Sequence, residues 1–137
     1  MSVNWAYDVM ELHSKHGVRE IVKNMDVQTL KEFLRFRVGF LQEELTELRS
    51  SESPEDVVDA LIDLCVVAIG TLDAFGVSAT RAWDEVHAKN MAKTSGSNPN
   101  RPNRFGFPDM IKPDGWTAPD HRGNTELLGR VFAGKEV

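Results

Sequence analysis

The chain has 137 residues, of which 41% are apolar, and this size and composition predict one folded domain rather than a disordered chain. Its net charge of −5 is unevenly distributed. Residues 1–92 contain 9 Lys and Arg and 16 Asp and Glu, whereas residues 93–137 contain 7 Lys and Arg and 5 Asp and Glu. An acidic body with a mildly basic tail argues against binding a nucleic-acid polymer, and the lack of an apolar run of ~18 residues argues against a membrane span.

Helical periodicity dominates the first two-thirds of the chain. In residues 27–49, apolar residues recur every three or four positions, beginning with Leu30, Phe33 and Leu34. This spacing is typical of a helix with one buried face. Ser53 followed by Pro54 indicates a helix start, because the hydroxyl can accept from a free backbone N–H and proline suits the first turn. We expect helices over residues 3–16, 27–49, 54 to 70–75, and 78–92.

The character of the sequence changes at Thr94. The residues that follow are rich in Pro, Gly and Asn and show no period, so we expect loops and then a short helix at about 125–132. We interpret residues 1–93 as a helical body and residues 94–137 as an irregular C-terminal arm of the same domain. The short connections favour antiparallel neighbours, so the predicted fold class is all-α with a four-helix-bundle core.

Two features suggest where the chain works. The first residues lack a basic segment followed by an apolar one, so we expect no signal peptide. Cys65 is the single cysteine, which excludes an intrachain disulfide, and a reducing, cytoplasmic location fits this usage. Because Cys65 has apolar neighbours in a predicted helix, we expect it to pack in the core.

Acidic residues are paired on the second and third predicted helices. Glu44 and Glu47 are three residues apart and share one helix face, and Asp56 and Asp59 repeat this spacing on the next helix. The two pairs are mirror images about the turn, so an antiparallel hairpin would place Glu47 opposite Asp56 and Glu44 opposite Asp59. Asp63 extends the acidic line by one more turn.

This arrangement would gather several negative charges in a small space, because packed helices lie ~8–10 Å apart. Like charges so close repel, and protons or bound cations must relieve the repulsion. Oxygen ligands alone favour Mg²⁺ or Mn²⁺ over zinc. Two plainer interpretations stay open: Asp56 can cap the helix start, and Glu44 with Glu47 can form a solvated helix face.

These motifs resemble those of the all-α NTP pyrophosphatase superfamily, which includes MazG, the dimeric dUTPases and phosphoribosyl-ATP pyrophosphohydrolase. The shared pattern E-x-x-E followed by [ED]-x-x-D reads EELTEL at residues 43–48 and DVVDALIDL at residues 56–64. Two further blocks, AIGTLDAFGV followed by WDEVHAKNMAK, and KPDGWTAPD at residues 112–120, resemble the phage and bacterial MazG-like branch often labelled Cof-like. The resemblance covers about residues 28–120.

The resemblance implies that a nucleoside triphosphate and water give the monophosphate and diphosphate. It implies Mg²⁺, which Mn²⁺ could replace, held by Glu44, Glu47, Asp56, Asp59 and Asp63. Glu43, or a neighbouring acid such as Glu44 or Glu47, would orient or deprotonate the attacking water. The family usually has Glu where this chain has Asp56 beside Glu55, so either residue could be the ligand there.

The resemblance also implies substrate contacts and a substrate class. Asn90 and Lys93 match residues that contact phosphate, and Lys112 is expected to do the same from the arm. Trp116 either stacks on the base or anchors the arm, and we hypothesise that the arm closes over the nucleotide. The phage-like branch favours a purine deoxynucleotide, dGTP or dATP, as in the MazZ type. The alternatives are a dUTP or dCTP pyrophosphatase, or a non-catalytic helical module that binds cations and partners.

A homo-oligomer is expected as well. Relatives form dimers or dimers of dimers, so we predict a tetramer or dimer of this chain, in the host cytoplasm if a phage encodes it. The helices carry more apolar residues than one thin bundle needs, and such surplus usually marks an interface. The surplus residues are Phe33, Phe36, Phe40, Val66, Ile69 and Phe75.

Overall fold

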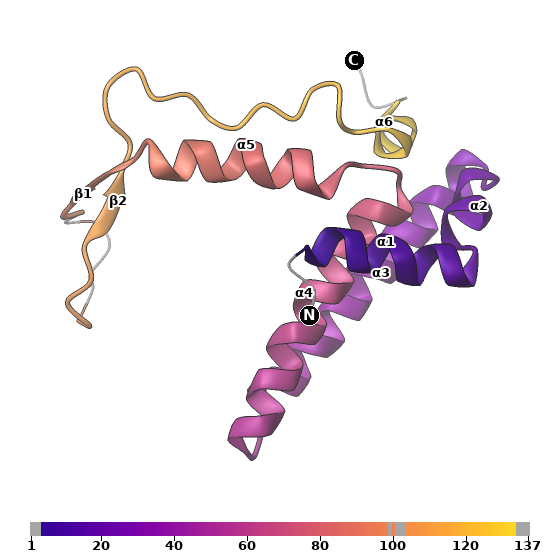
Figure 1. The fold of residues 1–137 in the computed structure, drawn as a ribbon, viewed down its shortest axis with the longest axis horizontal. Coiled ribbons are helices and arrows are strands. Elements are labelled where there is room, and N and C mark those ends of the chain that lie inside the picture. The colour runs from indigo at the N-terminus through magenta and orange to yellow at the C-terminus, as the bar shows by residue number, and fades with distance from the viewer. Residues whose placement is uncertain (1–3, 99, 101–103, 134–137) are drawn as a thin grey trace. The chain divides into compact units, whose positions relative to one another are not determined.

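The computed structural model describes residues 4–98, 100 and 104–133. Its helices are α1 (Trp5–His16), α2 (Val18–Lys23), α3 (Val27–Arg49), α4 (Pro54–Ala74), α5 (Ala79–Met91) and α6 (Leu127–Phe132), and its strands are β1 (Thr94–Gly96) and β2 (Asp109–Ile111) (Figure 1). The predicted all-α fold class is confirmed, since the regular structure of the described residues is helical apart from two strands of three residues each. No single helix in the described ranges is long and apolar enough to cross a membrane; α4 and α5 meet the criteria of length and composition only as a broken pair.

The chain forms two compact units, which we describe separately. Unit 1 contains the described residues up to Ala79 and those from Gly123 onward, and unit 2 contains Thr80–Arg122. The division thus falls at the start of α5, whereas the sequence changes its character only at Thr94. The C-terminal helix α6 belongs to the same unit as α1.

An antiparallel hairpin of the two long helices, α3 and α4, forms the centre of unit 1 (Figure 1). Asp26 caps α3 by accepting a hydrogen bond from the backbone N–H of Thr29, at 2.8 Å. Ser53 caps α4 in the same way from the backbone N–H of Asp56, at 3.1 Å, and Pro54 occupies the first turn as expected. The connection between the helices is only residues 50–53, so their acidic faces stay close together.

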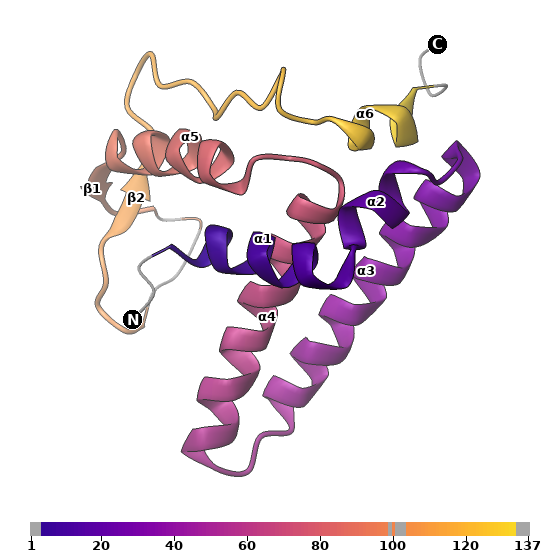
Figure 2. The same ribbon diagram turned by 45° about the vertical axis from the view of Figure 1, so that its right-hand side comes forward.

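The short helix α2 follows α1 almost directly, and α1 packs against α4 (Figure 2). Gly17 separates the two helices with a φ of 67°, and its N–H donates to the carbonyls of His13 and Ser14. The sequence predicted the end of α1 at this glycine. It did not predict α2, because six residues are too few to show a helical period.

The core of unit 1 lies where α2, α3 and the end of α4 meet α6. Leu30 and Phe75 are fully buried, and the ring of Phe33 packs on that of Phe75 with centroids 5.5 Å apart. Val131 of α6 belongs to the same cluster, and the backbone N–H of Leu127 donates to the carbonyl of Phe75 at 3.1 Å. Burying a Leu or Phe side chain contributes about 1.5–3 kcal/mol of stability. The cluster therefore holds the start of α3 and the end of α4 together.

Unit 2 consists of α5, the antiparallel strands β1 and β2, and a segment that runs back beside α5 (Figures 1 and 2). The indole N–H of Trp116 donates to the carbonyl of Lys89 at 2.9 Å, and the backbone N–H of Asp120 donates to a carboxylate oxygen of Glu85 at 2.9 Å. None of the described residues of unit 2 is buried. Polar contacts and the half-buried Trp116, rather than a core, therefore order the returning segment.

Candidate metal centre

Three carboxylates of the α3–α4 hairpin converge in unit 1. Glu44, Glu47 and Asp63 each offer one oxygen, and these oxygens all lie within 4.8 Å of one another. Glu44 is buried, Asp63 is half-buried and Glu47 is exposed, so the group opens from the helix interface to solvent. Among the residues that the structure describes, this is the one group of three or more potential metal ligands at such distances.

Glu44 is the residue on which the site depends. Its Oε2 is buried and has no hydrogen-bond partner, which is rare for a buried polar atom in a folded protein. Burial raises the pKa of the Glu44 carboxyl above its ordinary value, and the nearby charges of Glu47, Asp63 and Glu43 raise it further. A divalent cation would supply the missing partner and offset the repulsion, so the residues present fit a hard, oxygen-ligated metal ion.

A hollow of about 250 Å³ lies beside this group. It is lined by Glu47, Ser50, Ser51, Asp56, Asp59, Ala60 and Asp63. Asp56 and Asp59 are exposed and line the hollow, but neither belongs to the group of three converging carboxylates. Asp63 lines the hollow and also belongs to that group. The structure therefore brings four of the five predicted ligands to one hollow, and it places the fifth, Glu44, beneath it against Glu47 and Asp63.

The partner of Glu44 and Glu47 is thus Asp63, which lies one turn of α4 beyond Asp59 and two turns beyond Asp56, the residues that the mirror arrangement suggested. Bonds from Cα to Cβ tilt toward the N-terminus of a helix. In an antiparallel hairpin this tilt moves the side chains of α3 away from the turn and those of α4 toward it. An acid on α3 therefore meets a residue of α4 that is later in the sequence, and Asp63 fulfils this condition.

Asp56 also takes part in the start of α4. Its backbone N–H donates to Ser53 Oγ, and its carboxylate accepts from the backbone N–H of Glu52 at 3.4 Å. This is close to a capping box, the plainer interpretation of Asp56 raised by the sequence. Glu55 lies with Asp59 on a neighbouring part of the α4 surface, outside the hollow.

The four residues predicted to contact the substrate lie together in unit 2. Lys93 Nζ donates to Asn90 Oδ1 at 3.2 Å, and it also lies 5.3 Å from the centre of the Trp116 ring. Lys112 Nζ lies 5.0 Å from the same ring. Two ammonium groups on one indole form favourable cation–π contacts but repel each other, so the cluster would gain from a bound anion.

Lys89 belongs to this basic cluster, although the sequence analysis did not single it out. Its carbonyl holds the Trp116 indole, and its Nζ donates to Thr117 Oγ1 at 2.8 Å. No clear signal for it was present in the sequence, because Lys93 lies beyond the end of α5 at Met91 and the two lysines therefore do not share a helix face.

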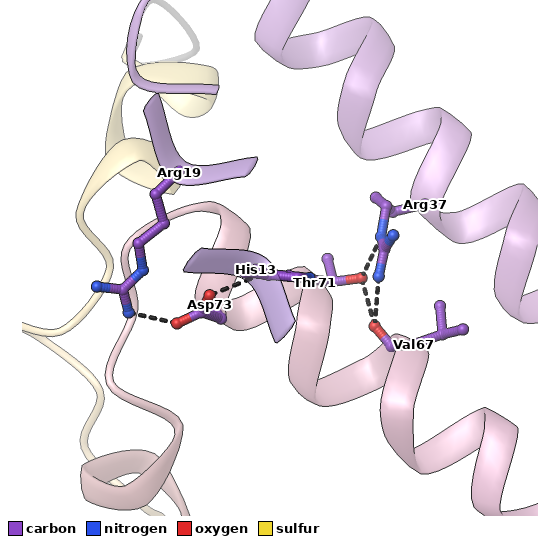
Figure 3. Close-up of polar contacts among 6 residues, drawn as sticks. All are labelled: His13, Arg19, Arg37, Val67, Thr71 and Asp73. Atoms are coloured by element: carbon purple, nitrogen blue, oxygen red, sulfur yellow. Dashed lines mark hydrogen bonds and ion pairs between the residues drawn. The ribbon is translucent and has the colours of Figure 1, made fainter. Parts of the chain in front are cut away.

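A buried polar network was also missed by the sequence analysis (Figure 3). His13 Nδ1 lies 2.7 Å from Asp73 Oδ2, and Arg19 pairs with the other oxygen of the same carboxylate. Asp73 is only 2% exposed, so two partners stabilise a charge that burial alone would make costly. The sequence did contain a signal for this network, because Asp73 lies in the apolar C-terminal part of α4, where a charged side chain has no polar helix face to occupy.

The fold and the acidic hairpin define the class of the protein as an all-α nucleotide pyrophosphohydrolase. The sequence model of the phosphoribosyl-ATP pyrophosphohydrolase family matches residues 15–90, more than half of the chain, and the chain belongs to this family. The match includes the acidic residues of both long helices and Asn90, and it ends before Lys93. No curated protein matches the chain in a sequence comparison. The protein is therefore a hydrolase acting on phosphoric anhydrides, and the alternative of a non-catalytic module is not retained.

Proposed function

We propose that the chain is a Mg²⁺-dependent nucleoside triphosphate pyrophosphohydrolase, in which Mn²⁺ can replace Mg²⁺. The observation that carries the metal is the buried, unpartnered Oε2 of Glu44 beside the carboxylates of Glu47 and Asp63. Asp56 and Asp59 complete the ligand set from the wall of the hollow. A divalent cation held there would supply positive charge against the phosphate oxygens and would make water a better nucleophile.

The acidic residues also provide the proton chemistry of the proposed reaction. Glu43 is exposed on α3 and lies one turn before Glu47 on the same face, so we assign it to orienting the attacking water and accepting its proton. The water oxygen bonds to the α-phosphorus while the bond to the bridging oxygen breaks. Pyrophosphate leaves with that bond's electron pair, and a nucleoside monophosphate remains.

We further propose that the basic cluster of unit 2 binds the substrate. Lys93 and Lys112 offer positive charge for phosphate oxygens, and Asn90 offers an amide. The Trp116 indole is held by the Lys89 carbonyl and flanked by both ammonium groups, which favours an anchoring role over stacking on a base.

The preferred substrate is a purine deoxynucleoside triphosphate, dGTP or dATP. This choice follows the resemblance of residues 68–77, 83–93 and 112–120 to the phage MazG-like and MazZ-type enzymes. The family match favours a second candidate, phosphoribosyl-ATP, whose α–β phosphate bond offers the same chemistry. A dUTP or dCTP pyrophosphatase is the third candidate. We place the activity in the cytoplasm, in a homodimer or homotetramer, and expect no binding of nucleic-acid polymers.

The decisive test is pyrophosphate release from a panel of dGTP, dATP, dUTP, dCTP and phosphoribosyl-ATP. We expect turnover of a purine deoxynucleotide with Mg²⁺, its loss with a chelator, and its return with Mg²⁺ or Mn²⁺. Glu47→Gln and Asp63→Asn should reduce turnover by about 10²-fold or more with unchanged helical circular dichroism. Glu32→Gln, an exposed acid on the same helix outside the group, is the matched control. Near-normal rates in both site variants would reject the metal centre.

A further inference from the structure

The acidic hairpin contains a second polar contact between its helices, two turns from the carboxylates (Figure 3). Arg37 of α3 donates from Nε to Thr71 Oγ1 at 2.9 Å and from Nη2 to the carbonyl of Val67 at 3.0 Å. Thr71 Oγ1 in turn donates to the same carbonyl at 2.8 Å. One planar guanidinium therefore holds two fixed points of α4, one a side chain and one the backbone.

We call the hydrogen bonds of Arg37 to Thr71 and to the Val67 carbonyl the clamp. The clamp and the acidic group lie on the same faces of α3 and α4. Arg37 precedes Glu44 by seven residues, which is two turns of α3, and Val67 and Thr71 follow Asp63 by one and two turns of α4. Because the helices are antiparallel, both partners of the clamp lie further from the connecting turn than the acids do. The clamp is thus the next polar contact along the interface that the acids share.

The acids cannot set the position of the helices themselves. Three charged carboxylates with oxygens within 4.8 Å would repel one another, so their charges oppose the close packing of α3 on α4. Arg37 is half-buried, and no carboxylate in the described part of the chain forms an ion pair with it. Its two hydrogen bonds to α4 therefore satisfy the Nε donor and one Nη2 donor at the interface, which a surface arginine would leave to water.

Gly70 shows that the close approach of Arg37 matters to the packing. A Cβ added to Gly70 would lie 2.9 Å from Arg37 Nη2 and 3.3 Å from His13 Nε2, too close for the present position of the guanidinium. A glycine inside a helix is less favourable than alanine, so its place one turn before the end of α4 is explained by this contact.

We propose that Arg37 and Thr71 are positioning residues that fix how α3 lies against α4 and so hold Glu44 and Glu47 at ligand distance from Asp63. The proposal rests on the proposed metal-dependent function of the acidic group. It predicts that metal affinity depends on hydrogen bonds about two helical turns away from the ligands. It assigns no contact with substrate to either residue.

The test measures the affinity for Mn²⁺ by electron paramagnetic resonance, together with thermal unfolding, in the full chain. Thr71→Val keeps the shape of the side chain but removes the hydroxyl that accepts from Arg37 Nε. Arg37→Gln removes the guanidinium. Each substitution should weaken Mn²⁺ binding about tenfold or more. Thr71→Ser keeps the hydroxyl and should retain the affinity. Gly70→Ala should weaken Mn²⁺ binding although the substitution favours a helix, because it displaces the guanidinium.

Val22→Ala is the control for stability alone. Val22 is 1% exposed in the core at the other end of unit 1, so this variant should lower the melting temperature and leave Mn²⁺ affinity unchanged. If wild-type protein binds Mn²⁺ and Thr71→Val binds it equally well, the positioning role is wrong while the metal centre stands. A change in KM alone at saturating metal would instead make Arg37 a substrate contact and overturn the proposal. If wild-type protein binds no Mn²⁺, the metal centre fails and the positioning role fails with it.

Discussion

At the scale of single residues, Glu44 links the charge of the site to the stability of the fold. Its pKa is raised above the ordinary value of 4.5, first by burial and then by Glu47, Asp63 and Glu43. The folded chain therefore holds this proton more tightly than the unfolded chain does. The free energy of unfolding of the metal-free protein must then fall as the pH rises from 4.5 through the raised pKa.

We predict that the melting temperature in chelator declines over this pH window and that Glu44→Gln removes the decline. Asp26 and Asp120 have lowered pKa values, so the stability they contribute is lost only as the pH falls below their ordinary value of 3.8, outside the window. The measurement is thermal unfolding by circular dichroism in steps of pH from about 4 to about 8. A melting temperature that rises across this window, with the same slope in Glu44→Gln, would contradict the assignment.

Residue types and spacings in the sequence were enough to select the acids but not their partners. Glu44 and Glu47 were singled out by their spacing and by the mirrored acidic pair on the next helix, and Asp63 because it extends that acidic line by one more turn. The group that the structure forms depends on the tilt of side chains toward helix N-termini, which counting positions about the turn ignores. Arg37 was not predicted to hold α4, since its partners, a hydroxyl and a backbone carbonyl, leave no charge pattern in the sequence.

At the scale of elements, the Asp73 network joins three helices. Asp73 of α4 accepts from His13 of α1 and pairs with Arg19 of α2, so one carboxylate anchors both short helices to the hairpin. We predict that Asp73→Ala lowers the free energy of unfolding by about 1–3 kcal/mol, because it leaves a buried histidine without its partner. Chemical denaturation measures this effect. Asp84→Ala, an exposed acid on α5, should change stability little, and equal losses in the two variants would argue against the anchor.

The segment that returns along α5 allows a second test at this scale. Because none of the residues that the structure describes in unit 2 is buried, the hydrogen bond from the Trp116 indole to the Lys89 carbonyl is a main fixed point of the segment. We predict that Trp116→Ala makes residues 104–122 sensitive to limited proteolysis while the melting temperature of the helices changes little. Lys112→Ala should leave proteolysis unchanged and reduce turnover if the lysine contacts phosphate. Wild-type kinetics in both variants would leave the segment a structural role only.

The regular elements were predictable in proportion to their length. The long helix α3 was predicted with its observed bounds, residues 27–49, since its apolar period runs through many turns. The strands β1 and β2 were not predicted, because each has three residues and their sequence does not alternate. Tertiary pairing, here of Thr94 with Ile111, decides such short strands, and a local pattern cannot reveal it.

At the scale of the whole molecule, the surface of unit 1 supports the proposed oligomer. Of the surplus apolar residues, Phe33 and Phe75 pack in the core, but Phe36 is 66% exposed. On α4, Val58 is 63% exposed and Leu61 is 47% exposed, and both lie on the apolar face of that helix. Large apolar side chains that are exposed together on one helix often mark an interface. We predict a dimer or tetramer in light scattering and its dissociation by Leu61→Glu. A monomeric wild-type protein at micromolar concentration would reject the oligomer.

Residues Ser78 and Asn124 give the chain an unusual topology. The backbone N–H of Ser78 donates to Asn124 Oδ1 at 2.9 Å, and Asn124 Nδ2 donates to the Ser78 carbonyl at 3.0 Å, so residues that flank unit 2 are tied together within unit 1. Unit 2 is therefore an insertion whose two ends leave from one point. Excising residues 80–122 and joining the ends by a short glycine-rich bridge should give a smaller protein that still folds around Leu30 and Phe75. The shortened protein would lose the basic cluster of Lys93, Lys112 and Trp116 and keep the acidic hairpin whole.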